Sequence, residues 1–367
     1  MKLVVFGLSV SSSWGNGHAV LWRALIRALA ADGHRIVFFE RDVPWYAQHR
    51  DLTEIEGARL VLYSDWDSLT AEARRELADA DAGIVTSYCP DGVAATELVL
   101  DAPGLHVFYD LDTPVTLARV EAGEALEAIG PHGLAPFDLV LSYTGGQALT
   151  ALSDRLGARR VAPLYGSVDV ARYAPAPRSE SSRAALSYLG TYAADRQDKV
   201  EALFLEPARR RPGLQFIIGG TQYPQDFAWT ENIFFWRHVV PPEHPRFYAA
   251  ARATLNVTRA TMAASGWCPS GRLFEAAACE SPILSDWWNG LADFFVPEHE
   301  ILIARTSGDV LSALDLGDAE LARIGEAGRA RTLADHTAER RAAEFVALLA
   351  NPTGDSANPP STVFTEA

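Results

Sequence analysis

The sequence lacks any apolar run long enough to cross a bilayer, because a membrane-spanning helix needs about 20 consecutive apolar residues. Its first segment, Met1 to Gly7, has the pattern of a buried strand, and no cleavage-site pattern for a signal peptide follows it. These two absences argue against membrane insertion and secretion. The sequence therefore predicts a cytoplasmic protein.

Cysteine is scarce, with only Cys89, Cys268 and Cys279, and none of them forms a CxxC pair. A disulfide framework needs an even set of cysteines, and a structural zinc site needs closely spaced ligands. We therefore expect neither. The three residues are interpreted as small buried thiols of a reducing compartment.

Basic residues are also scarce: the chain has 32 Lys and Arg residues against 47 Asp and Glu residues, which gives a net charge of −15. A broad nucleic-acid surface or electrostatic docking to anionic lipid requires the opposite balance. We therefore expect no nucleic-acid partner. Local basic pockets remain compatible with this composition.

The spaced-glycine fingerprint GxGxxG is missing from both halves of the chain, and no Walker lysine is present. Because that fingerprint accompanies the dinucleotide-binding turn of nicotinamide enzymes, a nicotinamide-dependent dehydrogenase is disfavoured.

Short apolar runs alternate with helix-length segments throughout the 367 residues. This alternation is typical of βα units on a mostly parallel sheet, and the length favours two domains. The clearest helix is expected over 18–31, with Gly33 as its stop. The predicted fold class is α/β, with two doubly wound, Rossmann-like domains. Strands are expected at 3–8, 35–39, 58–62, 83–86, 105–109, 139–143 and 160–163, then at 186–190, 215–218, 233–236, 254–257, 282–285 and 301–304.

The periodic pattern breaks over 169–182, where proline and serine accumulate in a segment typical of an exposed linker. We therefore predict an N-terminal domain over 1–170 and a C-terminal domain over 171–335. An amphipathic helix over 336–350 is expected to close the domain junction. Residues 351–367, rich in Pro, Ser, Thr and Gly, have the composition of a disordered tail.

A glycine-rich loop follows the first predicted strand and opens the first helix, at the kind of position where open α/β sheets bind ligands. Its residues Trp14, Gly15, Asn16 and Gly17 are predicted to bind an acceptor, because glycine permits close approach of the backbone. His18 follows them. It is interpreted either as a general base, with an ordinary pKa near 6.5, or as a polar group at the start of a helix.

Two carboxylates, Asp110 and Asp112, follow the predicted strand 105–109. Their alternate spacing points both side chains to a similar side if the backbone stays extended. No further ligand cluster accompanies them, so a metal site is not expected. We predict hydrogen bonds to sugar hydroxyls or a base role, with Asp110 as the candidate catalytic residue. A helix-capping aspartate before Thr113 is the alternative.

Three arginines, Arg196, Arg259 and Arg272, leave loops on the same predicted rim of the second domain. A diphosphate is their natural counter-charge, because guanidinium groups bind phosphate oxygens in pairs. The start of the Ala-rich helix after Pro269 adds free backbone N–H groups. The predicted donor-binding residues are Gly190, Thr191, Tyr192, Arg196, Thr258, Arg259, Ser270, Gly271, Arg272 and Glu275.

Glu275 is predicted to act differently from its neighbours, because phosphate would repel its carboxylate. We expect it to accept hydrogen bonds from a ribose diol, as acidic groups do in dinucleotide sites. The alternative is a glutamate near a helix start that the helix dipole favours.

With these residues in place, the chain resembles CgeB-type glycosyltransferases of the GT-B superfamily, which are related to the glycosyl transferases of group 1. The resemblance implies two Rossmann-like domains facing across a cleft, with the acceptor on the first and a nucleotide sugar on the second. It also implies that no metal or other cofactor is essential. The matching segments lie at 14–18, 109–114, 163–169, 189–192, 195–197, 255–259 and 269–279.

Two positions depart from that family pattern. Relatives in the retaining branch commonly have a glutamate where this chain has Trp267, and a glycine where it has Glu280. The first change leaves open whether the anomeric configuration is inverted or retained.

The leading interpretation is a metal-independent transferase that moves a sugar from a nucleotide-diphosphate sugar to a hydroxyl-bearing acceptor. A sugar-nucleotide epimerase of the same fold and a non-catalytic nucleotide-sugar-binding protein are the alternatives. The acceptor is open among small molecules, glycans and proteins, as are the donor base and sugar and the oligomeric state. Nine tryptophans offer candidate stacking faces for a sugar or aromatic acceptor, among them Trp14, Trp45, Trp229, Trp236, Trp287 and Trp288.

Overall fold

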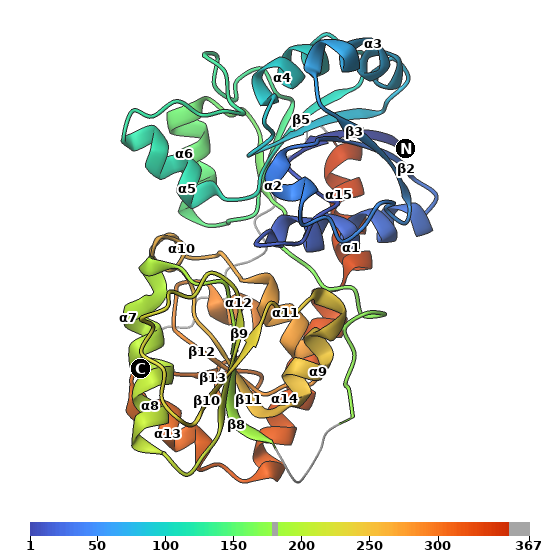
Figure 1. The fold of residues 1–367 in the computed structure, drawn as a ribbon. Helices are drawn as coiled ribbons and strands as arrows, with labels where there is room; N and C mark the ends of the chain where they lie inside the picture. The colour runs from blue at the N-terminus through green and yellow to red at the C-terminus, as the bar shows by residue number, and fades with distance from the viewer. Residues whose placement is uncertain (178–182, 352–367) are drawn as a thin grey trace. The chain divides into compact units, whose positions relative to one another are not determined.

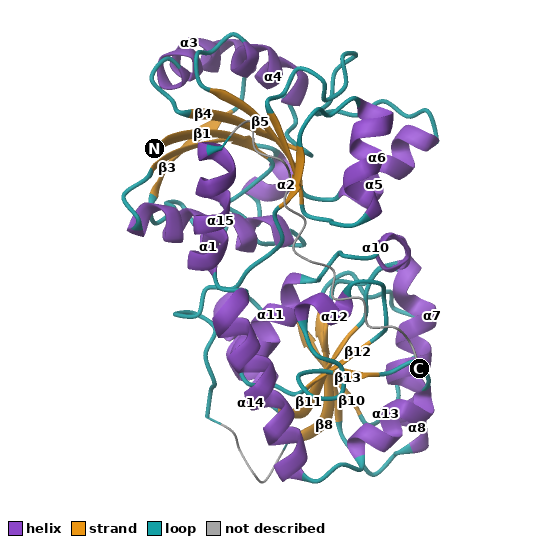
Figure 2. Ribbon diagram, turned by 180° about the vertical axis from the view of Figure 1, so that it is seen from behind, coloured by secondary structure: helices purple, strands orange, loops and turns teal. Residues whose placement is uncertain are grey.

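The computed structural model describes residues 1–177 and 183–351, and these divide into two compact units (Figures 1 and 2). Unit 1 holds Met1–Tyr165 and the chain from Ala338 onward, whereas unit 2 holds Gly166–Thr337. The sequence predicted the first domain to end at residue 170 and the second at residue 335, against 165 and 337 in the structure. Residues 178–182 of the predicted linker, and 352–367 of the predicted tail, lie outside the described residues.

Unit 1 is built on a seven-stranded parallel sheet in the order β3-β2-β1-β4-β5-β6-β7. All six residues of β1 are buried, because a parallel sheet is covered on both faces. Leu3 and Val5 point into one core, and Val4 and Phe6 into the other. The strands are β1 (Lys2–Gly7), β2 (Arg35–Arg41), β3 (Ala58–Tyr63), β4 (Ala82–Thr86), β5 (Leu105–Asp110), β6 (Leu139–Ser142) and β7 (Val161–Pro163).

Helices cover both faces of this sheet. Helix α1 packs against α15 in one core, to which Leu25 and Phe345 contribute. The other core receives Leu69 from α3, Leu98 from α4 and Leu152 from α6. The helices of unit 1 are α1 (Gly17–Ala31), α2 (Pro44–Ala47), α3 (Trp66–Leu77), α4 (Gly92–Leu100), α5 (Thr113–Glu121), α6 (Gln147–Leu156) and α15 (Ala338–Ala350).

Unit 2 repeats the architecture on a six-stranded parallel sheet in the order β10-β9-β8-β11-β12-β13. Its strands are β8 (Ala184–Leu189), β9 (Phe216–Gly220), β10 (Ile233–Arg237), β11 (Ala251–Asn256), β12 (Ile283–Ser285) and β13 (Leu302–Ile303). Its helices are α7 (Gln197–Val200), α8 (Glu206–Arg210), α9 (His244–Ala249), α10 (Ala260–Ser265), α11 (Gly271–Ala278), α12 (Leu291–Phe294), α13 (Ser307–Leu314) and α14 (Asp318–Asp335). A π-helical turn at Glu201–Leu205 joins α7 to α8.

The prediction of two doubly wound parallel sheets is confirmed, and every expected strand is present within a few residues of its expected position. The strand order reverses between β1 and β4 in unit 1 and between β8 and β11 in unit 2. Open α/β sheets bind ligands at such switch points. The predicted arrangement of the two domains across a cleft stays a prediction.

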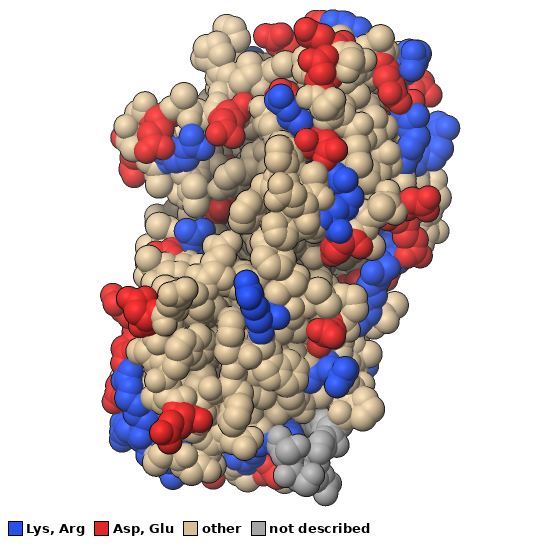
Figure 3. All heavy atoms as spheres, viewed as in Figure 1, with Lys and Arg blue, Asp and Glu red and all other residues tan. Residues whose placement is uncertain are grey.

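The charge distribution on the surface and the hydropathy of the helices agree with what the composition predicts. On the face drawn in Figure 3, acidic and basic side chains are interspersed over both units. Within 1–177 and 183–351, no helix is both long and apolar enough to span a membrane. The three cysteines are buried, as the sequence predicted.

Candidate functional site

The switch point of unit 2 gathers most of the predicted donor-binding residues. Gly190, Thr191 and Tyr192 directly follow β8, and Thr258 and Arg259 follow β11. Ser270 is the N-cap of α11, because its Oγ accepts a hydrogen bond from the backbone N–H of Arg272 at 3.3 Å. Gly271 is the first residue of that helix. The carboxyl ends of β8 and β11 and the start of α11 thus converge at one end of the sheet.

The loop after β8 is held by the loop after β9. Gly190 donates to the carbonyl of Gly219 at 2.9 Å, and Tyr192 donates to that of Thr221 at 2.9 Å. Gly220 has a φ of +151°, and a Cβ on it would lie 2.0 Å from the oxygen of Gly190. This close backbone approach requires glycine, so the loop that precedes Arg196 is rigidly supported.

Arg196 and Arg272 are half-buried, and each keeps a buried Nε without a hydrogen-bond partner among the described residues. Arg196 donates from Nη2 to the carbonyl of Thr191 at 2.5 Å. Both guanidinium groups act on Tyr223: burial raises the pKa of its hydroxyl, and the two positive charges oppose that rise. The two arginines therefore lie in one neighbourhood with N–H donors to spare, as a diphosphate site requires.

Arg259, the third predicted cation, is already paired. Its Nε lies 3.0 Å from Oδ2 of Asp195, and its side chain is 40% exposed. Donor binding by Arg259 would require exchange of this ion pair, so its predicted contact with phosphate stays a prediction.

Lys199 on α7 is a cation that the sequence analysis missed. It forms an ion pair with Asp286, whose side chain is nearly buried directly after β12. Asp286 also accepts from the backbone N–H of Thr258 at 2.9 Å. Lys199 is one of only two lysines in the chain and lies three residues after Arg196, a signal that could have identified it.

Glu275 is a buried carboxylate inside unit 2. Its Oε2 accepts from Nδ1 of His244 at 3.0 Å and from the hydroxyl of Tyr248 at 3.4 Å. Burial would raise its pKa, but His244 and then Arg272 outweigh that effect, and the pKa of Glu275 is lowered. Within the described residues no hydrogen bond reaches Oε1, so one oxygen remains for the ribose contact that the sequence predicts.

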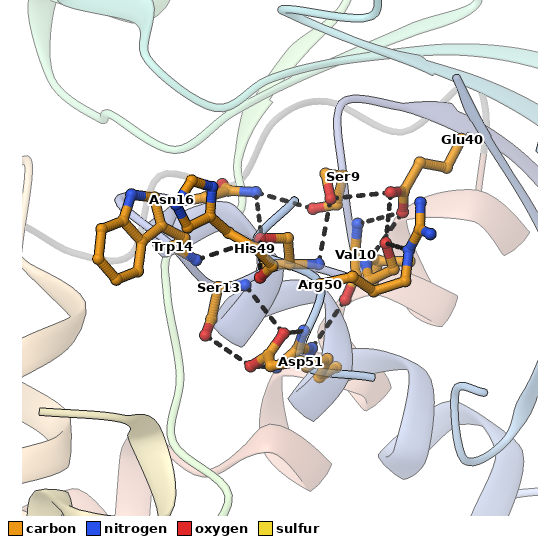
Figure 4. Close-up of polar contacts among 12 residues, drawn as sticks. Ser9, Val10, Ser13, Trp14, Asn16, Glu40, His49, Arg50 and Asp51 are labelled. Atoms are coloured by element: carbon orange, nitrogen blue, oxygen red, sulfur yellow. Dashed lines mark hydrogen bonds and ion pairs between the residues drawn. The ribbon is translucent and has the colours of Figure 1, made fainter. Parts of the chain in front are cut away.

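In unit 1, the loop after β1 is organised by Glu40, a fully buried residue of β2 that the sequence analysis missed (Figure 4). Its carboxylate accepts from the backbone N–H groups of Val10 at 2.7 Å and Ser11 at 2.9 Å. It also accepts from the hydroxyls of Ser9 at 2.9 Å and Ser11 at 2.6 Å. Four hydrogen bonds to one buried charge fix the path of this loop.

The predicted acceptor residues in this loop have largely structural contacts. The Nδ2 of Asn16 donates to the carbonyls of Ser9 and Ser12, and its Oδ1 caps α1 by accepting from the N–H of His18 at 3.1 Å. Trp14 stacks on His49, with ring centroids 4.4 Å apart. Gly15 and Gly17 are exposed. Acceptor binding by these four residues stays a prediction.

His18 is half-buried at the start of α1, and its ring lies 5.7 Å from that of Tyr88. Its Nδ1 is buried and has no hydrogen-bond partner in the part of the chain that the structure describes. Burial lowers the pKa of His18 to about 4. At that pKa the imidazole is neutral at neutral pH but is a weaker base than a free imidazole, and a general-base role for His18 stays a prediction.

Asp110, the last residue of β5, is fully buried. Its Oδ1 accepts from the N–H of Asp112 and from the hydroxyl of Thr116, both at 3.1 Å. Its Oδ2 is buried without a partner in the described residues. Burial, partly offset by these hydrogen bonds, raises the pKa of Asp110 to about 6. That value is closer to neutrality than the pKa of His18, so of the two predicted bases Asp110 has the pKa better suited to proton transfer near neutral pH.

Asp112 immediately precedes α5, but its side chain makes no capping hydrogen bond. Its Oδ2 instead accepts from the hydroxyl of Tyr88 at 3.0 Å. Asp112 thus occupies the N-cap position of α5 without a side-chain capping bond, and its carboxylate lies beside Tyr88.

Tyr88 was not identified from the sequence. Its φ of +64° is unusual for a bulky residue, and such strain concentrates at functional sites. Tyr88 also lines a cavity of about 30 Å³, whose other walls include Ser87, Phe108, Thr116 and Arg119. This volume can hold about one water-sized group, next to the residues that contact Asp110.

No group of three or more His, Cys, Asp or Glu side chains within the described ranges is placed to hold a metal ion.

Residues 196–347 match a family model described as "Glycosyl transferase-like". Among curated proteins, no sequence matches the chain. Sucrose-phosphate synthase from Thermosynechococcus elongatus is similar in structure, with a TM-score of 0.68 and 15% identity over 96% of this chain and 99% of that one. HepE from Anabaena, in complex with UDP and glucose, has a TM-score of 0.67 and 14% identity over 95% and 99%. An alpha-glucosyltransferase in complex with UDP has a TM-score of 0.68 and 10% identity over 95% and 100%.

The structural likeness extends over nearly the whole chain, and the family match covers most of unit 2. The chain therefore has the two-domain GT-B fold, and within it residues 196–347 match the glycosyl transferase-like family model.

Proposed function

We propose that this protein is a glycosyltransferase that uses a nucleotide-diphosphate sugar as donor and a hydroxyl-bearing acceptor. The observation that carries this proposal is the pair Arg196 and Arg272 at the switch point of unit 2, each with a buried Nε that has no partner within the described residues. The family match begins at Arg196. HepE and the alpha-glucosyltransferase are described in complexes with UDP, and we extend nucleoside diphosphate binding to this chain.

In the proposed reaction, the acceptor oxygen bonds to the anomeric carbon of the donor sugar while the bond from that carbon to the diphosphate oxygen breaks. Negative charge grows on the departing diphosphate. Arg196 and Arg272, together with the N–H groups at the start of α11, stabilise that charge and so lower the barrier.

The proton of the acceptor hydroxyl passes to Asp110. Its carboxylate is mostly ionised above its pKa of about 6, and its Oδ2 has no partner among the described residues. Asp112 and Tyr88 position the acceptor beside it. These roles use no metal ion, and we propose a metal-independent, CgeB-type enzyme that acts in the cytoplasm on a hexosyl donor.

Thermal denaturation with a panel of nucleoside diphosphates and nucleotide sugars tests donor binding, because a ligand of the native state raises Tm by mass action. Arg272→Ala should abolish the shift. Arg323→Ala is the matched control, since Arg323 is exposed and paired with Glu320. If no nucleotide raises the Tm of the wild-type protein, the proposal is wrong.

Mass spectrometry of donor and acceptor mixtures then separates the three classes of function. A transferase yields glycosylated acceptor and nucleoside diphosphate. An epimerase converts or cleaves the donor without an acceptor, and a non-catalytic binding protein leaves the donor unchanged.

A further inference from the structure

Five aromatic rings form a continuous surface beside the candidate donor loop of unit 2. We call this the aromatic surface; its members are Tyr192, Tyr223, Phe227, Trp229 and Phe235. Tyr223 contacts all four others, with ring centroids between 5.0 and 5.8 Å. Phe227 and Trp229 lie 4.5 Å apart. The rings come from the loops after β8 and β9 and from the edge strand β10.

This surface is open to solvent on its outer side. Trp229 is 36% exposed and Phe235 is 38% exposed, whereas the other three rings are half-buried. A single exposed aromatic residue is ordinary. A contiguous group of exposed rings is more typical of a binding surface.

The inner side of the aromatic surface is joined to the loop that precedes Arg196. The hydroxyl of Tyr223 donates to the carbonyl of Gly190 at 3.0 Å, and the N–H of Tyr192 donates to the carbonyl of Thr221 at 2.9 Å. Tyr223 also lies within electrostatic range of both Arg196 and Arg272. The aromatic surface therefore adjoins the loop that carries Arg196.

We infer that the aromatic surface is the platform on which the nucleobase of the donor stacks. This inference rests on the proposed function and extends it to the mode of base recognition. In a nucleoside diphosphate, one ribose separates the diphosphate from a flat base. The aromatic surface is a cluster of tilted rings beside Arg196 in which Trp229 and Phe235 are the most exposed, and a cationic site next to such rings matches the charge of the diphosphate and the flat base that follows it.

Base recognition by stacking predicts that the site accepts different nucleobases with similar affinity. Every nucleobase has a π face, and stacking on aromatic side chains discriminates weakly between them. The hydroxyl of Tyr223 is engaged by Gly190, so this residue contributes its ring and not its hydroxyl group. We therefore expect uridine, guanosine and adenosine diphosphates to bind within about tenfold of one another.

Calorimetric titrations of UDP, GDP, ADP and inorganic pyrophosphate into the full chain test the inference. Trp229→Ala should weaken binding of all three nucleotides by about ten- to a hundredfold and leave pyrophosphate binding unchanged. Trp229→Phe should restore most of the affinity. Trp45→Ala is the matched control, because Trp45 is 53% exposed and belongs to unit 1. Nucleotides should also quench the fluorescence of the wild type more than that of Trp229→Phe.

The outcomes separate the inference from the proposed function. If the wild type binds neither nucleotide nor pyrophosphate, the proposed function fails, and the inference fails with it. If Arg272→Ala loses nucleotide binding but Trp229→Ala keeps wild-type affinity, only the inference is overturned. The inference is also overturned if Trp229→Ala loses nucleotide affinity and pyrophosphate affinity equally. It is overturned too if Trp229→Ala changes the oligomeric state but not the nucleotide affinity, because the aromatic surface would then bind a second copy of the chain.

Discussion

The hydroxyl of Tyr88 donates a 3.0 Å hydrogen bond to Oδ2 of Asp112, and Tyr88 makes this contact from a backbone φ of +64°. A bulky residue adopts this conformation at a cost of about 1 kcal/mol or more. The ring also lies against His18. Tyr88 therefore connects three elements at the switch point of unit 1: the start of α1, the end of β4 and the loop after β5.

We expect Tyr88→Phe to reduce turnover about tenfold, since a hydrogen bond to a charged group contributes about 1.5 kcal/mol or more. The phenyl ring retains the contact with His18, so the fold should be preserved. Steady-state kinetics of donor turnover measure the effect. A change in KM alone, with kcat unchanged, would show that Tyr88 acts only in binding.

Asp110 should make the protein less stable as the pH rises. Burial raises its pKa from an ordinary 3.8 to about 6, so the folded state holds the proton more tightly than the unfolded state. The resulting stability is fully present below about pH 3.8 and is lost as the pH rises through about 6. Asp110→Asn removes this dependence. Its free energy of unfolding should exceed that of the wild type by on the order of 3 kcal/mol above pH 7 and match it near pH 4.

Urea denaturation of both proteins across this range measures the difference, and turnover measured in parallel should fall in Asp110→Asn. Identical pH profiles for the two proteins would remove Asp110 as a buried ionisable group. Thr70→Ser, an exchange on α3 outside the switch point, is the control for the effect of substitution itself.

The sequence predicted the strands well because each buried parallel strand is a short, almost wholly apolar run. The observed strand ends differ from the predicted ones where the composition gives no signal. Strand β9 continues through Gly219 and Gly220, although glycine usually ends a strand, and β11 begins at Ala251, three residues before its predicted start. The donor loops were also predictable, since arginines after strand ends are visible in the sequence.

The remaining site residues depend on contacts between distant segments. Glu40 lies 29 to 31 residues from the loop residues that it binds, and Lys199 lies 87 residues from Asp286. No periodic pattern encodes such a pair. The positive φ of Tyr88 is likewise a property of the folded backbone, and the low pKa of His18 follows from burial that helix amphipathicity did not reveal.

Arg272→Ala should lower turnover by about two orders of magnitude, the effect of losing one group that stabilises developing charge. Arg272→Lys should recover only part of the activity, because an ammonium group cannot bind two phosphate oxygens in a fork. Arg323→Ala should leave kcat and KM unchanged. A fully active Arg272→Ala enzyme would remove this residue from the mechanism.

Glu275 and His244 should stabilise unit 2 together at neutral pH. Nδ1 of His244 lies 3.0 Å from Oε2 of Glu275, and its Nε2 lies 3.2 Å from the carbonyl of Val239. Glu275→Gln removes the buried carboxylate that pairs with His244 and interacts with Arg272, and removing one partner of such a buried pair costs about 3 kcal/mol. Because the pKa of Glu275 is lowered from 4.5, its contribution is fully present above about pH 4.5 and is lost as the pH falls through the lowered value.

The difference in unfolding free energy between Glu275→Gln and the wild type should therefore be largest near pH 7 and should shrink in acid. Urea denaturation at several pH values measures it. Glu320→Gln is the matched control, because Glu320 is half-exposed and pairs with Arg323 on the surface, where an ion pair contributes little. The double variant Glu275→Gln with His244→Gln should be no less stable than Glu275→Gln alone, because replacing both partners of a buried pair costs less than removing one of them. If the double variant is instead clearly the less stable of the two, the contact between Glu275 and His244 does not account for the destabilisation of Glu275→Gln.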